Sequence, residues 1–218
     1  MSLRYPLVCF DLDGTLVDDT IYIWKTLHEG FATDPDARKR AHDDFASGRI
    51  TYERWFAHDL ALLAAAGATK PRIETLLDKL RPMRGAREVL ASLRAAGHKI
   101  AIISGSLDIV IDRLFPDFAF DHVLVNRIRF ARGGRIAGGE HTPYDLERKA
   151  DGLKELCRRE GLSAAQAAFV GDNVNDVWVA RAAGLAIAFN CKSEELRKTC
   201  AVEVKGRDLR AVLRHLAG

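Results

Sequence analysis

Four short apolar runs, separated by segments with helical spacing, constrain the fold of this 218-residue chain most strongly. The runs cover residues 7–10, 99–103, 167–170 and 185–189. Runs of this length without polar alternation are typical of strands buried on both faces of a parallel sheet. Between them, residues 85–96 and 149–160 repeat apolar side chains at helical spacing. We therefore predict an α/β fold, a doubly wound parallel sheet with right-handed crossovers.

The remaining elements of this core are predicted from the same two periodicities. They are helices at 107–114, 175–183 and 209–216, strands at 120–125 and 202–204, and a hairpin of 127–130 with 135–137. The hairpin turn is assigned to the Gly133-Gly134 pair.

Residues 18–81 contain no strand-like run, only apolar residues at helical spacing, and Pro82 follows them. We predict a small helical domain over 18–81, inserted between the first strand and the rest of the sheet, with 1–17 and 82–218 forming the core. Trp24, Trp55 and Phe56 are expected to pack between the inserted helices, with lining of a pocket as the alternative.

Asp11 and Asp13 follow the first apolar run, in the segment Asp-Leu-Asp-Gly-Thr. Residues i and i+2 of an extended chain point the same way, so both carboxylates are expected to face one spot at the carboxyl edge of the sheet. One carboxylate can attack a phosphate there, and the other can hand a proton to the leaving oxygen. The alternative is an ordinary polar turn, in which Asp-Gly pairs are common.

Asp172 and Asp176 form a second acidic cluster after the run at 167–170, flanked by Asn173 and Asn175. A turn that caps the next helix, with Asn173 as the cap, explains part of this pattern. Two aspartates four residues apart are more than a cap requires. Four carboxylates at one sheet edge repel unless a cation joins them, and hard oxygen ligands favour Mg²⁺. We predict a magnesium site formed by Asp11, Asp13, Asp172 and Asp176.

Ser104 and Gly105 follow the run at 99–103, where a hydroxyl, backbone N–H groups and a helix start can bind an anion. Capping of the following helix is the alternative for these serines, and Ser106 is the expected cap. Lys149, at the start of a predicted helix, is a candidate because a phosphate near four carboxylates needs positive charge beyond the metal.

The composition excludes several function classes. The formal charge of +3 arises from 33 basic and 30 acidic residues dispersed along the chain, which argues against nucleic acid as a partner. No window approaches 18 uninterrupted apolar residues, and the first residues lack the apolar region of a signal peptide, so no membrane association is expected. The four cysteines show no disulfide or zinc spacing, which favours a reducing, cytoplasmic location.

The motifs, in this order along the chain, resemble those of the haloacid dehalogenase-like (HAD) superfamily, and their spacing is most similar to its phosphoserine phosphatase branch. They are Asp11-x-Asp13-Gly-Thr, Ser104 after a strand, Lys149, and Gly171-Asp172-x-x-Asn175-Asp176. The resemblance covers nearly the whole chain, including a helical cap inserted after the first motif.

The resemblance implies a Mg²⁺-dependent phosphatase that hydrolyses a small phosphomonoester through an aspartyl-phosphate. Asp11 would be the nucleophile, and Asp13 would protonate the leaving alkoxide and then activate water. Asp11, the Asp13 carbonyl and Asp172 would hold Mg²⁺, with Asp176 steadying the site. Ser104, Gly105, Lys149 and Asn175 would bind the substrate phosphate. The partner is then a small phosphorylated metabolite, and the protein a monomer or homodimer.

The chain departs from the branch where specificity is set. Gly14 stands where a serine is usual, and Thr20 where a glutamate meets the substrate's ammonium, unless Asp18 or Asp19 replaces it. The cap arginine for the substrate carboxylate corresponds to Arg49 or Arg54. The alternatives are therefore a phosphatase for another small metabolite (phosphoglycolate, a sugar phosphate or a methionine-salvage phosphate), a phosphotransferase, or a non-catalytic binding module on the same scaffold.

Overall fold

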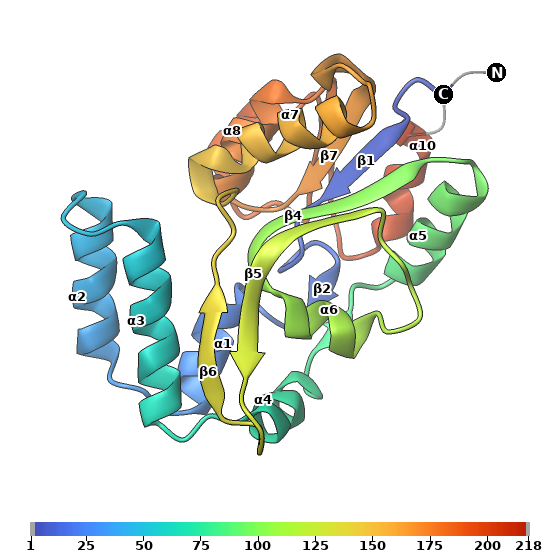
Figure 1. Ribbon diagram of the computed structural model, residues 1–218. Helices are drawn as coiled ribbons and strands as arrows, with labels where there is room; N and C mark the ends of the chain where they lie inside the picture. The colour runs from blue at the N-terminus through green and yellow to red at the C-terminus, as the bar shows by residue number, and fades with distance from the viewer. Residues whose placement is uncertain (1–2, 217–218) are drawn as a thin grey trace.

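The computed structural model describes residues 3–216, and its core is a seven-stranded sheet (Figure 1). The strand order is β6-β5-β4-β1-β7-β8-β9. The strands are β1 (Leu7–Phe10), β4 (Lys99–Leu107), β5 (His122–Phe130), β6 (Ile136–Glu140), β7 (Ala167–Gly171), β8 (Leu185–Phe189) and β9 (Val202–Val204). All pairings are parallel except that of β5 with β6. The predicted α/β class and its parallel sheet are confirmed.

Helices cover both faces of this sheet (Figure 1). They are α5 (Ala86–Ala95), α6 (Asp108–Leu114), α7 (Lys149–Arg159), α8 (Val177–Ala182), α9 (Glu194–Thr199) and α10 (Leu213–Leu216). Alternate residues of β1 face opposite ways: Leu7 and Cys9 pack with the apolar side chains of α7 and α8, whereas Val8 and Phe10 pack with those of α5 and α10. Because both sides are buried, the strand has to be apolar throughout, as its sequence is.

The carboxyl end of β1 occupies the centre of the sheet. The chain passes from β1 to β4 on one side and later to β7 on the other, so the strand order reverses at β1. Open α/β sheets bind ligands at the carboxyl edge beside such a reversal. The residues that follow β1, β4 and β7 therefore share one edge.

The segment between β2 (Val17–Asp18) and β3 (Arg81–Pro82) is helical, as predicted. It contains α1 (Ile23–Gly30), α2 (Pro35–Ala46), α3 (Tyr52–Ala65) and α4 (Lys70–Leu77). Strands β2 and β3 pair antiparallel where the chain leaves and re-enters the core, a pairing too short to show in the sequence. The β5–β6 hairpin extends from the sheet to these helices, where the Lys70 N–H donates to the Gly134 carbonyl at 2.7 Å (Figure 1).

Several predicted boundaries were wrong. The strands predicted at 120–125 and 127–130 are one strand, β5, which begins at His122 and continues through Asn126 because that residue is fully buried and hydrogen-bonded rather than part of a turn. Strand β4 continues through Ser104 to Leu107 instead of ending at 103. Residues 174–176 form a 3₁₀ turn before α8 begins at Val177, and α9 was not predicted. None of the helices within residues 3–216 has the length and apolar character needed to cross a membrane.

Candidate active site

Asp11 and Lys149 meet at the centre of the sheet edge. Asp11 follows β1 directly, and its N–H donates to the Val170 carbonyl of β7 at 2.9 Å. Lys149, the first residue of α7, is fully buried, and its ammonium donates to Asp11 Oδ1 at 2.8 Å and to Asp176 Oδ1 at 2.7 Å. Burial lowers the pKa of Lys149, but the charges of Asp11 and Asp176 outweigh it and the net shift is upward. A permanently charged lysine therefore holds one oxygen of Asp11.

The Asp13 carboxyl lies beside Asp11 with both oxygens engaged. Oδ1 accepts from the Ser106 hydroxyl at 2.9 Å, and Oδ2 accepts from the N–H of Ile23, the first residue of α1, at 2.7 Å. Burial raises the pKa of Asp13 to about 7, and the charge of Asp11 adds to the rise. A carboxyl with a pKa near neutrality can both donate and accept a proton.

Asp172 and Asp176 are buried next to this pair. Asp176 Oδ2 accepts from the N–H groups of Asp172 and Asn173 at 3.0 and 3.2 Å, so both of its oxygens have partners. Asn173 caps the following turn, as predicted, by accepting from the Val174 N–H. Burial, reinforced by the charge of Asp11, raises the pKa of Asp172 to about 7 and of Asp176 to about 6.

One oxygen each of Asp11, Asp172 and Asp176 lie within 4.8 Å of one another. Buried carboxylates this close repel unless a cation joins them, and an all-oxygen donor set suits Mg²⁺. The donor set fits the metal that the sequence implied. The Asp13 carboxylate, predicted as a fourth ligand, is not part of this group. Its two oxygens instead accept from the Ser106 hydroxyl and the Ile23 N–H.

Lys192 is a further charged group at this site, and it was not predicted. Its ammonium, which is partly exposed, lies 2.6 Å from Asp172 Oδ2. Gly14 makes room for this ion pair: its φ is +77°, and a Cβ there would lie 2.3 Å from Asp172 Oδ2 and 2.7 Å from Lys192 Nζ. The position of Lys192 just beyond β8, the strand next to that of Asp172, is the one sequence signal that could have identified it.

Residues near the end of β4, Ser104 to Ser106, face the same point. Ser104 Oγ accepts from the Ser106 N–H at 3.2 Å, and a Cβ on Gly105 would lie 2.1 Å from Asp145 Oδ2, so this position requires glycine. Ser106 does not cap α6, as had been expected, because Leu107 takes that position and the Ser106 hydroxyl bonds Asp13. The alternation of an extended strand, which puts i and i+2 on one side, could have predicted this.

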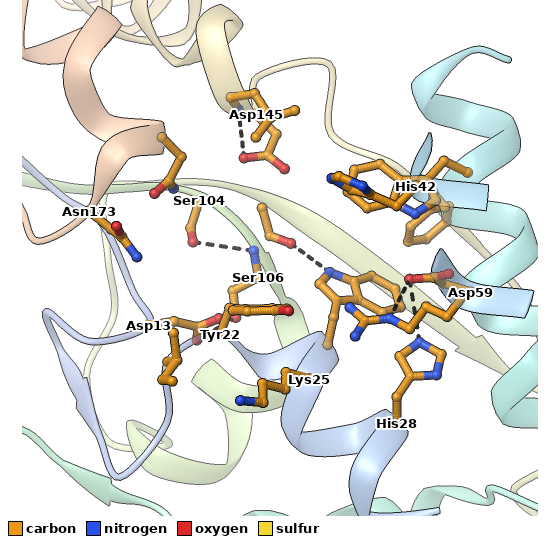
Figure 2. Close-up of a pocket in the computed structure, with 18 of the residues that line it drawn as sticks. Asp13, Tyr22, Lys25, His28, His42, Asp59, Ser104, Ser106, Asp145 and Asn173 are labelled. Atoms are coloured by element: carbon orange, nitrogen blue, oxygen red, sulfur yellow. Dashed lines mark hydrogen bonds and ion pairs between the residues drawn. The ribbon is translucent and has the colours of Figure 1, made fainter. Parts of the chain in front are cut away.

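These residues open into a cavity of about 830 Å³ between the sheet edge and the cap helices (Figure 2). Asp11, Asp13, Ser104, Gly105, Asp172 and Asn175 line it. Lys149 and Asp176 do not line it and are fully buried, so they act on the site through Asp11 and Asp172. The structure thus brings all the predicted site residues together. Most of them line the cavity, and Lys149 and Asp176 lie buried behind them.

The cap contributes residues that the sequence did not single out. The Tyr52 hydroxyl donates to Asp145 Oδ2 at 2.8 Å and accepts from the Asn126 amide at 3.1 Å, which links α3 to the core. Trp24, Trp55 and Phe56 pack between the cap helices, as predicted, since Trp24 of α1 meets Phe56 of α3 and Trp55 of α3 stacks on Phe45 of α2. All three also line the cavity, the alternative considered for them. Neither of the two arginines predicted to meet a substrate carboxylate lines the cavity. Arg49 is exposed and paired with Asp44, and Arg54 is exposed on α3. Arg38 is the arginine in the cavity wall.

Comparison with known proteins agrees with this geometry. The sequence model of the haloacid dehalogenase-like hydrolases matches residues 8–181. The chain is 25% identical over 217 residues to a phosphoserine phosphatase of Methanocaldococcus jannaschii, covering 99% of this chain and 100% of that protein. It is 31% identical over 189 residues to a phosphoserine phosphatase of Archaeoglobus fulgidus, covering 85% of this chain and 53% of that protein, about half its length.

Solved structures share the fold over nearly the whole chain. A phospho-aspartyl intermediate analogue of phosphoserine phosphatase superposes with a TM-score of 0.76 at 24% identity, covering 97% of this chain and 99% of that one. A HAD family hydrolase from Salmonella enterica superposes with a TM-score of 0.80 at 20% identity, covering 98% of this chain and 72% of that one. At these identities the superpositions establish the common fold.

Proposed function

Because the chain belongs to the haloacid dehalogenase-like hydrolases, we propose that it is a Mg²⁺-dependent phosphatase that hydrolyses a small phosphomonoester through an aspartyl-phosphate. The observation that carries the proposal is the pair Asp11 and Asp13. One carboxylate is fixed by a buried lysine, and the other has its pKa raised to about 7. The phosphoserine phosphatases among the relatives support the same reaction class.

Asp11 is the proposed nucleophile. Lys149 holds its Oδ1, which leaves Oδ2 as the oxygen that attacks phosphorus. The new O–P bond forms as the bond from phosphorus to the ester oxygen breaks, and the proton on Asp13 passes to the leaving oxygen to give the alcohol.

Asp13 then acts as a base in the second step. It takes a proton from a water molecule, whose oxygen attacks the aspartyl-phosphate, releasing phosphate and restoring the Asp11 carboxylate. Mg²⁺, when bound by Asp11, Asp172 and the Asp13 carbonyl, offsets the charge of the phosphate oxygens. Ser104, Gly105 and Asn175 line the cavity beside Asp11 and are the proposed phosphate contacts.

Residues 18–81 are proposed to act as a cap that excludes water during transfer. The Ile23 N–H at the start of α1 bonds the Asp13 carboxylate, so cap position and the proton donor are coupled. The four cysteines have free thiols, which supports a reducing, cytoplasmic location, and the proposed partner is a small phosphorylated metabolite.

Asp11→Asn tests the nucleophile, with Asp151→Asn, an exposed carboxylate on α7, as the matched control. We expect the Asp11 variant to lose at least about 1,000-fold in kcat on an aryl phosphate while its circular dichroism is unchanged. In the parent protein, a quenched reaction should contain an acyl phosphate on Asp11 that hydroxylamine cleaves. Activity retained by Asp11→Asn would refute the assignment. Transfer to added alcohols at the expense of free phosphate would indicate a phosphotransferase instead.

A further inference from the structure

The cavity above Asp11 is large for the ester of a small amino acid. Its volume of about 830 Å³ lies in the upper part of the range of roughly 300–1,000 Å³ that is typical of sites for drug-sized ligands. Asp13 and Ser104 lie on one side, as Figure 2 shows, while Asp59 and His28 lie across the cavity from them. The space between these two sides is available to the leaving alcohol.

Aromatic side chains line much of this space. Five of them belong to the cavity wall: Tyr22, Trp24, Tyr52, Trp55 and Phe56. Trp24 meets Phe56 edge to face at 5.7 Å, and Tyr52 meets Trp55 in the same way at 5.8 Å. The Trp24 indole N–H donates to the Gly105 carbonyl at 3.0 Å, which fixes this ring next to the phosphate side. Fixed aromatic walls favour a flat ring that can stack or meet them edge to face.

A buried carboxylate lies behind the same wall. Asp59 on α3 is 3% exposed, and its Oδ2 lies 3.4 Å from both His28 Nε2 and Arg38 Nε. Its Oδ1 is buried and lies 3.5 Å from His58 Nδ1. Basic side chains of the cap therefore surround this carboxylate, and a ligand in the cavity does not reach its Oδ1.

The groups expected to hold a small zwitterion do not face the cavity. The Thr20 hydroxyl is hydrogen-bonded to that of Thr26 at 2.7 Å. Asp18 and Asp19, the candidate replacements for the missing glutamate, both pair with Arg207 instead of lining the cavity. Because none of these three residues faces the cavity, the side chains that do line it, the five rings among them, determine which leaving group fits.

We propose that the leaving alcohol carries a flat ring and that the aromatic wall of the cavity binds this ring. The proposal rests on the phosphatase activity proposed above and names the class of its substrate. The two proposals depend on different residues: the reaction needs Asp11 and Asp13, whereas the preference for a ring needs the aromatic side chains of the cap.

Matched alkyl phosphates test the ring, since their leaving oxygens differ little in reactivity. We expect kcat/KM for 2-phenylethyl phosphate to exceed that for ethyl phosphate by at least about tenfold, from burial and aromatic contacts of the ring. Phosphoserine should fall below the phenylethyl ester. Hydrolysis of none of these esters would refute the phosphatase itself. Equal kcat/KM for the ethyl and phenylethyl esters, or preference for phosphoserine, would overturn the ring proposal alone.

Variants of the wall connect the preference to these residues. Phe56→Ala should bring the ratio of kcat/KM for the phenylethyl and ethyl esters toward 1, and a loss common to both esters cancels in the ratio. Tyr22→Ala is the second variant, because Tyr22 is 42% exposed and its truncation does not threaten folding. Trp178→Ala, an exposed ring on α8 outside the cavity, is the control and should keep the ratio. An unchanged ratio in both wall variants would place ring recognition elsewhere.

Discussion

Asp172 is shared between two positive charges that cannot be bound equally well at once. Lys192 lies 2.6 Å from its Oδ2, and the three clustered carboxylates favour a divalent cation at the same place. Gly14 permits this arrangement, since a side chain at that position would collide with both members of the ion pair. We therefore expect Lys192 to neutralise Asp172 in the metal-free protein and to compete with Mg²⁺ for it.

Lys192→Met should tighten Mg²⁺ binding. Removing a cation a few ångströms from a metal site removes a repulsion of roughly 1–4 kcal/mol at effective dielectric constants between those of water and protein. About a tenfold lower Kd is expected in calorimetric titration of EDTA-treated protein with Mg²⁺. Lys198→Met, an exposed lysine of α9 paired with Glu194, is the matched control and should not change the Kd. Weaker or unchanged Mg²⁺ binding by Lys192→Met would contradict the competition.

Among the elements, α1 and α3 carry the contacts between the cap helices and the core that bear on the site. Trp24 of α1 donates to the Gly105 carbonyl, and the Tyr52 hydroxyl of α3 bonds both Asp145 and Asn126. Burial raises the pKa of Asp145, and the charge of Lys149 only partly opposes this. Asp145 therefore depends on its hydrogen bonds, and the position of α3 is tied to the loop beneath Gly105.

Tyr52→Phe should weaken the contact between α3 and the core while keeping an aromatic ring in the cavity wall. The loss of one hydroxyl leaves Asp145 Oδ2 without its partner, for which we expect about 1–3 kcal/mol of the free energy of unfolding, measured in urea. KM should rise several-fold on an aryl phosphate, with a smaller change in kcat, because the chemistry resides in the core. Tyr144→Phe is the control, since the Tyr144 hydroxyl makes no hydrogen bond with the described residues. Equal destabilisation by the two variants would show that the hydrogen bonds of the Tyr52 hydroxyl do not stabilise the contact between α3 and the core.

The elements also show which parts of the molecule the sequence could predict. The buried strands and the order Asp11, Ser104, Lys149, Asp172 are local patterns, and a parallel sheet brings the carboxyl ends of its strands to one edge regardless of detail. The two-residue pairing of β2 with β3 and the continuity of β5 depend on tertiary contacts, which override local turn signals. No spacing rule connects Tyr52 with Asp145, 93 residues away.

The arginine in the cavity illustrates the same limit. Arg38, Arg49 and Arg54 lie on or beside α2 and α3, and their positions in the sequence do not distinguish them. Arg38 is the one in the cavity wall because it packs against buried Asp59, whereas Arg49 bonds Asp44 on the outside. Arg49 and Arg54 were predicted from the resemblance alone. The packing of α2 on α3, which sequence position does not reveal, instead places Arg38 in the cavity wall.

At the scale of the whole molecule, the buried aspartates make the stability of the fold depend on pH and on metal binding. Burial raises the pKa values of Asp13 and Asp172 to about 7 and of Asp176 to about 6, from 3.8. The folded protein then binds more protons than the unfolded chain between about pH 4 and pH 7, so the contribution of these groups to stability falls as pH rises through that window. A cation that needs the ionised carboxylates reverses the loss, because it binds the folded state alone.

The stabilisation by Mg²⁺ should therefore increase with pH. With Mg²⁺ at about 100 times its Kd, linkage gives about 2.7 kcal/mol, equivalent to roughly 5–10 °C in Tm for a chain of this size. We expect a difference in Tm between Mg²⁺ and EDTA of that order at pH 8 and less than half of it at pH 5, where protons occupy the ligands. Asp172→Asn should remove most of the difference at pH 8, whereas Asp151→Asn should retain it. A difference independent of pH would mean that Mg²⁺ stabilises the protein somewhere other than at these buried aspartates.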